Sequence, residues 1–306
     1  MRNRFADTFY ELGKTDPRLC VVVADISPAG SIAKFRNEFP NRFINTGVAE
    51  QIMIGMVAGM AQRGLRPFAY TIATFTLYRP FEMVRDDLCY QNLPVTIVGI
   101  GGGVTYSTLG ATHHAQEDVA IACAIPNMSV IAPCDPAETE AATRWCAKQE
   151  GGPVYLRLGK AGEPDFTKQA PDAWAFGKLR MLRQGGDVCI VSYGPIMKRA
   201  MAVAERFEAK GKRTAVVSAH TLKPLDRDGL ARVLRNFPHV VVIEECAPNG
   251  SLAMQVREHA NRIGATCRLD TFTLQDKFIH CYGSHDDILD AHGLGIADIS
   301  AQLSLN

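Results

Sequence analysis

Glu50 is an ionisable residue at the head of a segment whose composition suits burial. It follows Gly47 in the stretch "GVAEQ" and precedes the run "IMIGMVAGMA", in which Gly55 and Gly59 would allow another backbone to approach closely. The helix dipole favours an acid in a first turn by about 0.3 to 1 kcal/mol, which is the ordinary explanation for such a residue. A helix that is apolar on nearly every face is buried, however, and a buried acid is destabilising unless it is paired or functional. Glu50 is therefore a candidate site residue.

An aromatic series follows in the stretch "TIATFTLYRPFEMVRDDL". Phe75, Tyr78 and Phe81 recur every third residue and could present one aromatic face. Taken alone, core packing is the better explanation for them, because aromatic residues dominate protein cores. Arg79 and Arg85 in the same stretch are expected to be solvated or paired.

Two adjacent histidines, His113 and His114, lie in the long stretch "GIGGGVTYSTLGATHHAQED" after a predicted strand. Its glycines suggest a dinucleotide fingerprint, but that motif needs a helix to start within the glycines, and "VTYSTLGATHH" has no helical period. Imidazoles in a loop at the end of a strand could transfer protons at neutral pH, or they could be a surface pair with no task.

The elements that must position these residues alternate between short β-rich runs and segments of helical periodicity. This alternation predicts parallel strands joined by helical crossovers, which is an α/β fold. In the first half the expected strands are 19–24, 67–71, 95–100, 129–132 and 154–158, and the expected helices are 4–14, 50–62, 81–90 and 136–149. In the second half the expected strands are 187–194, 213–220, 239–245 and 267–273, and the expected helices lie near 196–210, 226–236 and 250–263.

The stretch between the two halves has no period and is rich in glycine, proline and charge, so it is expected to be a linker. The predicted division is a first domain at 1–160, a linker at 161–177 and a second domain at 178–306. Each domain is expected to contain a mostly parallel sheet flanked by helices.

Composition narrows the possible partners and the compartment. With 33 basic and 32 acidic residues the net charge is +1, which gives no sign of a nucleic-acid or anionic-membrane surface. The nine cysteines include no CxxC pair, the N-terminus lacks the apolar core of a signal peptide, and no apolar run is long enough to span a bilayer. We expect a soluble cytoplasmic protein with reduced thiols, and we expect no metal ligands among its residues.

Four stretches taken together, in order and spacing, resemble the pyrimidine-binding domain of transketolases. They are "GVAEQ", "YTIATFTLYRPF", "STLGATHHAQED" and "NMSVIAPCDPAE". The second half, with "LKPLDRDGL", "VVVIEE" and "DKFIHCYGSHDDIL", resembles the transketolase C-terminal domain. The resemblance covers essentially the whole chain.

This resemblance implies thiamine diphosphate as cofactor and gives several residues a role. Glu50 corresponds to the family glutamate that hydrogen-bonds a ring nitrogen of the aminopyrimidine, and in a dry pocket such a carboxylate strongly biases the protonation of that ring. Asp25 matches an aspartate near the cofactor at the subunit interface. His113 matches the histidine that contacts the reacting oxygens of the substrate, and His114 is its neighbour. The aromatic residues that the family packs around the pyrimidine correspond to Phe75, Tyr78 and Phe81.

One half of a complete transketolase is missing from this sequence. The family binds the diphosphate through Mg²⁺ in another domain, which is marked by a GDG motif, and no such motif occurs here. The chain therefore resembles the C-terminal subunit of a split transketolase. An N-terminal diphosphate-binding subunit is expected to provide most of the Mg²⁺ ligands and to form an α2β2 assembly with this chain. The implied reaction transfers a two-carbon ketol unit from a ketose to an aldose, and the chain alone should be inactive.

The substrate-binding positions depart from the family pattern. Leu109 stands where transketolases usually carry an aspartate that contacts a sugar hydroxyl, and Gly101 stands in place of a phosphate-binding histidine. The family's phosphate-binding arginine falls near Lys160, with Arg157 close by. A lysine can bind an anion as a point charge without the arginine fork. An acidic tail on the sugar is therefore expected, whether phosphate or another anion.

Two other functions remain open from the sequence. The β subunit of a 2-oxo acid dehydrogenase decarboxylase component also begins its pyrimidine helix with a glutamate, although "STLGATHHAQED" is more similar to transketolase. A non-catalytic scaffold subunit of the same fold could tolerate Leu109, but it would have no physical need for a buried acid beside an aromatic pocket. Deoxyxylulose phosphate synthase shares these motifs and would carry its diphosphate domain on the same chain.

Overall fold

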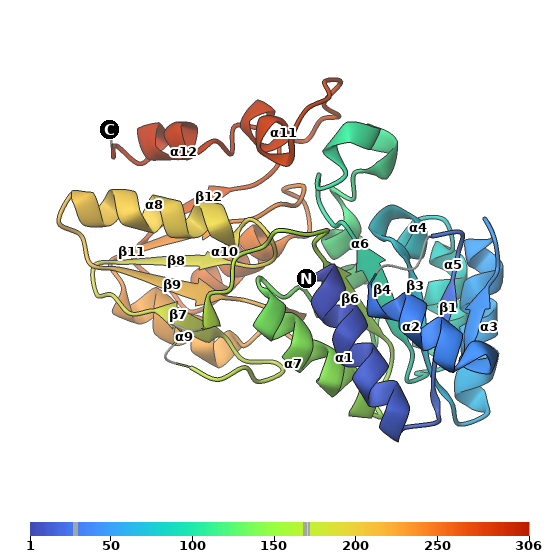
Figure 1. The fold of residues 1–306 in the computed structure, drawn as a ribbon. Coiled ribbons are helices and arrows are strands. Elements are labelled where there is room, and N and C mark those ends of the chain that lie inside the picture. Colours follow the sequence, from blue (N-terminus) through green and yellow to red (C-terminus); the bar gives the residue numbers. More distant parts are fainter. Residues whose placement is uncertain (27–29, 168–169, 171, 306) are drawn as a thin grey trace.

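The computed structural model describes residues 1–26, 30–167, 170 and 172–305, without the side chain of Ser31. These residues form two α/β domains that lie side by side, with the blue-to-green half of the chain in one and the yellow-to-red half in the other (Figure 1). Each domain has a mostly parallel sheet flanked by helices, so the predicted fold class is confirmed.

The first sheet has seven strands in the order β10-β5-β6-β4-β3-β1-β2. All neighbours pair in parallel except β10, which is antiparallel to β5. Strand β10 comes from the second half of the chain, so one short strand crosses from the second domain into the first sheet. The strand bounds are β1 Leu19–Val23, β2 Phe43–Asn45, β3 Arg66–Ile72, β4 Thr96–Ile100, β5 Ser129–Ile131, β6 Val154–Leu158 and β10 Thr221–Lys223.

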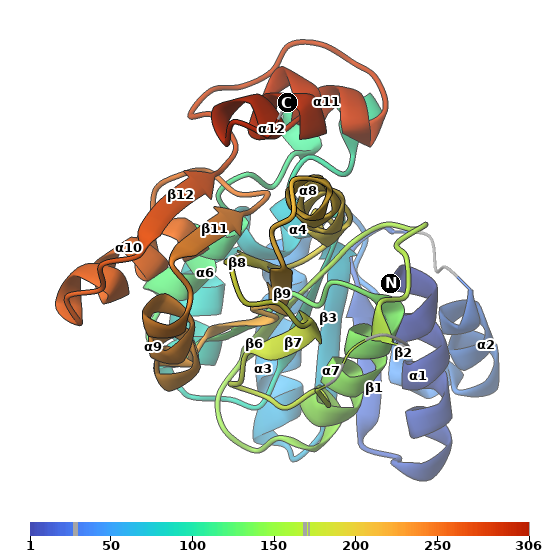
Figure 2. The ribbon, with the colours of Figure 1, turned by 90° about the vertical axis from the view of Figure 1, so that its left-hand side faces the viewer.

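The second sheet has five strands in the order β12-β11-β8-β9-β7, and only β7 is antiparallel to its neighbour. Figure 2 looks onto this domain, where helix α8 is seen nearly end-on at one side of the sheet and α9 and α10 lie on the other side. The strand bounds are β7 Arg180–Arg183, β8 Val188–Ser192, β9 Thr214–Ser218, β11 His239–Ile243 and β12 Arg268–Phe272.

Helices cover both faces of the first sheet. Helices α1, α2 and α7 enclose one core, in which Phe5 and Phe9 pack against Phe35, Phe68 and Tyr70. Helices α3 and α6 lie on the other face. The helix bounds in this domain are α1 Arg2–Thr15, α2 Ser31–Glu38, α3 Glu50–Gln62, α4 Ala73–Leu77, α5 Phe81–Met83, α6 Asp118–Ala124 and α7 Pro136–Lys148.

The core on the α3 and α6 side continues without a break into the second domain. Val119 and Ala122 of α6 belong to the same buried cluster as Val191 and Tyr193 of the second domain. The two domains therefore pack as one body along this face. The helices of the second domain are α8 Met197–Ala209, α9 Arg227–Asn236, α10 Leu252–Arg262, α11 His285–Ala291 and α12 Ile296–Gln302.

The segment predicted as a helix over 81–90 is less regular than expected. Helix α5 covers Phe81–Met83, and a π-helical stretch, η2, continues from Val84 to Tyr90. The chain is interrupted just before it, because Pro80 separates α5 from α4. No helix within the described residues is long and apolar enough to cross a membrane.

Candidate active site

The candidate residues of the first domain gather at one edge of the seven-stranded sheet. Strands β1, β3, β4 and β6 are parallel, so their carboxyl ends share an edge, which is where open α/β sheets place ligands. Four candidates follow the ends of these strands: Asp25, Phe75, His113 and Lys160. Glu50 reaches the same edge from the end of β2, at the start of α3.

Glu50 is buried and is held by one arginine. Its side chain is 3% exposed, and both carboxylate oxygens accept hydrogen bonds from Nη1 of Arg79 at 2.8 Å. The expectation that this acid is buried is confirmed, and so is the expectation that Arg79 is solvated or paired. The guanidinium of Arg79 lies over the Phe75 ring at 4.5 Å, and its side chain is 39% exposed. Since Arg79 is partly in solvent, it can release Glu50 to another partner without opening the core.

The composition of helix α3 had suggested burial on nearly every face, but one face of the helix is exposed. Met53, Ile54 and Val57 are fully buried, but Ile52 is 61% exposed and both glycines of the helix are exposed. A Cβ added at Gly55 or Gly59 would meet nothing within 4 Å. The helix thus has a second apolar face that this chain leaves uncovered. We call Val48, Ile52, Gly55, Met56 and Gly59 the α3 outer face.

The three aromatic candidates do not form a single face, because the chain turns between α4 and α5. Phe75 packs edge-on against the His113 ring, with centroids 5.2 Å apart. The Tyr78 hydroxyl donates a hydrogen bond to Oε2 of Glu117 at 2.9 Å, and burial raises the pKa of Tyr78. Phe81 is exposed at the start of α5. Only Phe75 therefore lies against another candidate residue.

His113 sits in a short 3₁₀ helix, η4 (Ala111–His113), within the loop after β4. Its Nδ1 lies 2.9 Å from the hydroxyl oxygen of Thr112. Burial lowers the pKa of His113, so the imidazole is largely neutral at pH 7 and can accept or donate a proton. The Phe75 contact places His113 beside the aromatic ring over which the Arg79 guanidinium lies.

His114 is enclosed, unlike its neighbour. It is buried, neither ring nitrogen has a hydrogen-bond partner within the described residues, and burial lowers the pKa of its imidazole. The structure thus separates the two adjacent histidines, with His113 partly exposed at the sheet edge and His114 facing inward.

Asp25 has an unusual backbone conformation at the end of β1. Its φ of 43° lies in the left-handed region, which residues other than glycine seldom adopt. Its backbone N–H donates to Oδ1 of Asn45 at 3.2 Å, and the same oxygen accepts from the N–H of Gly47 at 2.9 Å. Asn45 therefore joins Asp25 to the turn that leads into Glu50. Strain of this kind concentrates at functional sites, which supports Asp25 as a candidate.

Lys160 is an exposed cation at this edge. Its Nζ lies 5.1 Å from the centre of the Tyr106 ring. The same ring occupies the space that a side chain at Gly101 would need, because a Cβ there would lie 2.2 Å from the ring. The glycine that replaces the expected histidine is thus required by the packing of Tyr106, and Lys160 lies beside the same ring as an exposed positive charge.

Arg157, the second predicted anion-binding residue, is enclosed between the domains. It is 2% exposed, its Nε donates to Oδ2 of Asp118 at 2.8 Å, and its Nη2 donates to the backbone carbonyl of Glu245 at 2.9 Å. Oδ2 of Asp118 also accepts from the Tyr155 hydroxyl at 2.8 Å. The structure therefore does not bring Arg157 and Lys160 to a common surface.

Replacing Arg157 by methionine is expected to lower the free energy of unfolding by about 3–5 kcal/mol, because it leaves the buried Asp118 carboxylate without its cation. Urea unfolding of the isolated chain measures this loss. Arg144→Met is the matched control, since Arg144 is about half exposed and pairs with Glu140 on the same helix, so a loss of less than about 1 kcal/mol is expected. Equal losses in the two variants would contradict the structural role of Arg157.

No group of three or more His, Cys, Asp or Glu side chains within the described ranges is arranged to hold a metal ion. The edge of the sheet provides a buried carboxylate, a neutral imidazole, an aromatic ring and an exposed ammonium group. Such a set can bind a heteroaromatic ring and an anionic substrate. It offers no oxygen cage for a divalent cation that would hold a diphosphate.

Comparisons with known proteins cover both halves of the chain. Residues 1–162 match the transketolase pyrimidine-binding domain, and residues 177–299 match the transketolase C-terminal domain. A putative transketolase C-terminal section of Methanocaldococcus jannaschii is 34% identical over 99% of this chain and 95% of its own length. A subunit of the apulose-4-phosphate transketolase of Phocaeicola vulgatus is 31% identical over 84% of this chain and 82% of its own length. A 6-deoxy-6-sulfo-D-fructose transketolase subunit of a Clostridium species is 33% identical over 84% of this chain and 80% of its own length.

Solved structures agree with these sequence matches. A split-gene transketolase, described as an inactive β4 tetramer, superposes with a TM-score of 0.88 at 34% identity and covers 99% of this chain and 96% of its own. A transketolase of Pichia stipitis superposes with a TM-score of 0.79, but at 19% identity and over 45% of its own length, so it supports the fold alone.

Proposed function

Because this chain belongs to the transketolase family, we propose that it is one subunit of a split transketolase that transfers a two-carbon ketol unit from a ketose to an aldose. The observation that carries the proposal is the buried carboxylate of Glu50 at the sheet edge, with Arg79 as its partly exposed partner and with Phe75 and His113 beside it. A fold maintained only as a scaffold has no physical need for this arrangement.

The residues present fit one half of thiamine diphosphate. Glu50 would hold the aminopyrimidine by a hydrogen bond once Arg79 releases it, and Phe75 would pack against the ring. Tyr78, Phe81 and Asp25 remain proposed neighbours of the cofactor. When bound, the cofactor supplies the electron sink that breaking and forming carbon–carbon bonds requires. The carboxylate of Glu50 biases the protonation of the ring nitrogen that it faces.

His113 is proposed to act on the substrate. Its neutral imidazole lies at the edge of the site, where it can hydrogen-bond a substrate hydroxyl or carbonyl oxygen and move a proton at neutral pH. His114 is enclosed, so its proposed part is to support the loop beside His113. The role of these histidines is positioning and proton transfer.

A partner subunit is proposed to complete the site. The described residues offer no cation cage for the diphosphate, so we propose that an N-terminal diphosphate-binding subunit provides it with Mg²⁺. The α3 outer face begins beside Glu50 and is apolar and uncovered, which suits burial against that subunit. An α2β2 assembly would bury two such faces. The relatives named as a C-terminal section, as one subunit of a transketolase and as an inactive β4 tetramer support a divided enzyme.

The substrate is proposed to be a sugar with an anionic tail. Lys160 is an exposed cation at the sheet edge, and Leu109 is exposed in the same loop as His113. Two relatives are named for sugars with an anionic group, which is a phosphate in apulose 4-phosphate and a sulfonate in 6-deoxy-6-sulfo-D-fructose. A lysine binds either group as a point charge.

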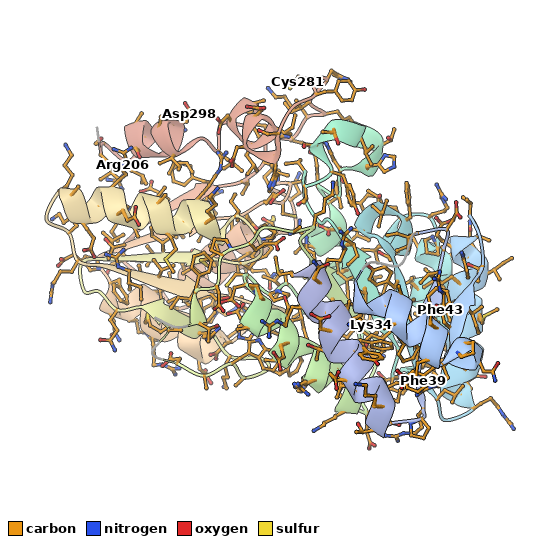
Figure 3. All side chains as sticks on the ribbon, in the orientation of Figure 1. Lys34, Phe39, Phe43, Arg206, Cys281 and Asp298 are labelled. Carbon is orange, nitrogen blue, oxygen red and sulfur yellow. The ribbon has the colours of Figure 1, made fainter. Side chains whose placement is uncertain are left out.

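The cytoplasm is kept as the proposed compartment because of the cysteines. All nine are free thiols, and Cys281 is exposed in the loop before α11 (Figure 3). Free thiols are typical of a reducing compartment, whereas proteins of oxidising compartments usually form disulfides.

The test is to mix the purified chain with a candidate diphosphate-binding transketolase subunit from the same genome, in the presence of thiamine diphosphate and Mg²⁺. Ketol transfer is then measured by product identification with apulose 4-phosphate, 6-deoxy-6-sulfo-D-fructose and sugars without an anionic tail. Turnover is expected only from the pair, and mainly with the anionic sugars. Turnover by the chain alone would contradict the divided enzyme.

A further inference from the structure

The loop that carries His113 is closed at its base by backbone hydrogen bonds. The N–H of Gly103 donates to the carbonyl of Ala115 at 3.1 Å, and the N–H of Ala115 donates back to the carbonyl of Gly103 at 2.7 Å. Residues 104–114 thus form a closed loop. We call its two ends, at residues 103–104 and 115–116, the stems of the loop. A group that holds the two ends of this loop therefore restrains the segment that carries His113.

The second domain forms hydrogen bonds with both stems. Oε1 of Glu245 accepts a hydrogen bond from the backbone N–H of Val104 at 2.6 Å, and the N–H of Ala247 donates to the carbonyl of Gln116 at 2.7 Å. Glu245 follows β11, is completely buried, and has its own carbonyl held by Arg157. Two residues of one short segment in the second domain therefore hold both ends of the loop in the first domain.

The contact at Glu245 is close enough to require glycine on the opposite side. A Cβ at Gly103 would lie 2.3 Å from Oε1 of Glu245, and Gly103 has a φ of 68° that favours glycine. The loop backbone approaches the carboxylate as closely as it does because position 103 has no side chain. This complementarity between the domains is specific, since it fixes the register of the stem on the carboxylate.

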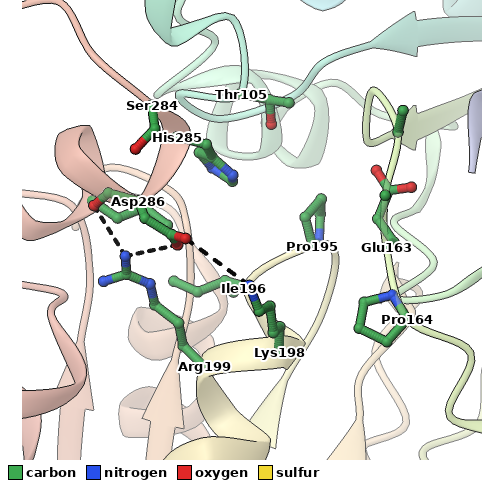
Figure 4. Close-up of a pocket in the computed structure, with 13 residues that line it drawn as sticks. Thr105, Glu163, Pro164, Pro195, Ile196, Lys198, Arg199, Ser284, His285 and Asp286 are labelled. Atoms are coloured by element: carbon green, nitrogen blue, oxygen red, sulfur yellow. Dashed lines mark hydrogen bonds and ion pairs between the residues drawn. The ribbon is translucent and has the colours of Figure 1, made fainter.

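A histidine completes the contact. Nε2 of His285, the first residue of α11, lies 2.8 Å from the same Oε1 of Glu245. Burial alone would lower the pKa of His285, but the neighbouring Glu245 carboxylate raises it above its ordinary value. In Figure 4, His285 and Thr105 line an interdomain cleft of about 280 Å³, through which solvent reaches the imidazole.

Other charged and titratable groups also act on this pair. From the first domain, Arg157 and His114 face Glu245, and burial lowers the pKa of His114. From the second domain, burial lowers the pKa of His292 to about 4, and Asp286 and Arg199 lie beside His285. Burial would raise the pKa of Glu245, but His285 and Arg157 lower it below its ordinary value. The Glu245–His285 pair is therefore charged on both sides in mildly acidic solution.

We propose that Glu245 of the second domain is a positioning residue that holds the His113 loop in its working place, with His285 as the group that keeps the Glu245 carboxylate oriented. This inference rests on the proposed function for the role of His113, but the contact itself does not depend on that role. It gives the second domain a task at the active site, although Glu245 and Val104 are 141 residues apart.

The experiment compares Glu245→Gln with Glu244→Gln in the 306-residue chain by amide hydrogen exchange. Glu244 is the matched control, because it is equally buried but binds Tyr193 and the start of α10 and has no hydrogen bond to the loop. Glutamine keeps an acceptor oxygen for the Val104 N–H but carries no charge, so its hydrogen bond is weaker and it forms no ion pair with protonated His285. Glu245→Gln is therefore expected to raise exchange in residues 104–114 by about tenfold relative to Glu244→Gln. Equal exchange in the two variants, or no change from the unsubstituted chain, would overturn the proposal.

His285→Gln is the second variant. The His285 side chain is partly exposed in the cleft, so folding should tolerate the substitution. The raised pKa of His285 means that its ion-pair contribution is complete below about pH 6.5 and is lost as the pH rises through the folded-state value. The lowered pKa of Glu245 means that its contribution is present above about pH 4.5 and is lost as the pH falls further. Protection of the loop from exchange should therefore be greatest between these two pH values. The loss of protection as the pH rises above them should disappear in His285→Gln. A loop whose protection has the same pH dependence in both chains contradicts the part assigned to His285.

The kinetic arm uses the reconstituted pair. Glu245→Gln should lower kcat by about tenfold or more, because small misplacement of a reacting group is costly to rate, while the thiamine diphosphate concentration for half-saturation stays unchanged. Glu244→Gln should leave both near their original values. If the unsubstituted pair transfers no ketol unit, the proposed function fails, and hydrogen exchange still decides whether Glu245 holds the loop.

Discussion

Replacing Glu50 by glutamine is expected to lower the kcat of the reconstituted pair by at least about 100-fold, which is the usual effect of losing a positioned acid–base group. Glutamine has nearly the volume of glutamate, and its amide oxygen can still accept a hydrogen bond from Arg79. It carries no negative charge, however, so it cannot bias the protonation of a ring nitrogen as the carboxylate does. The loss should therefore appear in catalysis and only weakly in stability.

The measurement is steady-state ketol transfer by pairs that contain the substituted chain, with thermal unfolding of each chain recorded in parallel. Glu82→Gln is a suitable control, because Glu82 is an exposed acid in the neighbouring helix α5 and is outside the Glu50–Arg79 contact. Activity within twofold of the unsubstituted pair would mean that Glu50 is a first-turn acid with no catalytic part.

A double substitution in α3, Gly55→Ala with Gly59→Ala, is expected to strengthen the isolated chain and to weaken its assembly with the partner. In the isolated chain neither new methyl group meets an atom within 4 Å, and alanine is favoured over glycine within a helix by about 1 kcal/mol at each site. In an assembled interface the same methyl groups would be extra volume in packed surroundings, which typically costs about 1–3 kcal/mol. A loss of about 1.4 kcal/mol raises the dissociation constant tenfold.

Urea unfolding of the dilute chain and titration with the partner subunit measure the two effects separately. Gly151→Ala provides the control, because a Cβ there also meets nothing and Gly151 lies far along the chain from the α3 outer face. Stabilisation without any loss of partner affinity would show that the α3 outer face is not the contact. Sedimentation of the chain alone shows whether a second copy covers this face instead.

Much of the fold follows from local patterns in the sequence. The bounds of α3 were predicted as the structure has them, and α7 begins after Asp135, whose side chain accepts a hydrogen bond from the N–H of Glu138 at 2.7 Å. Strands β1 and β4 are short apolar runs whose burial requires no distant information. Periodicity and capping residues are sufficient where an element is long or strongly patterned.

Strands β2, β7 and β10 were not predicted, because their pairing depends on distant segments. Strand β10 has three residues and pairs with β5, which lies about 90 residues earlier in the chain. Strand β7 pairs antiparallel at the edge of the second sheet, and β2 ends the first sheet. None of these segments has enough alternating residues to show a period of two.

The candidate site was predicted in its residue types and only partly in its contacts. The burial of Glu50 followed from the apolar helix behind it, but Arg79 as its partner did not, since the two are 29 residues apart. The spacing of the aromatic residues suggested one face, but the Tyr78 hydroxyl binds Glu117, and Phe81 is exposed beyond the turn at Pro80. The anchor of the His113 loop at Glu245 has no local signal, because its geometry exists only after the two domains pack.

The central claim is that this chain builds one half of a cofactor site. The most direct measurement is the equilibrium binding of thiamine diphosphate, with Mg²⁺ present, to this chain, to a diphosphate-binding partner and to their mixture. We expect tight binding only in the mixture, and we expect it to weaken when Glu50→Gln replaces the unsubstituted chain. Binding to this chain alone as tight as to the mixture, or no binding in the mixture, would contradict the claim.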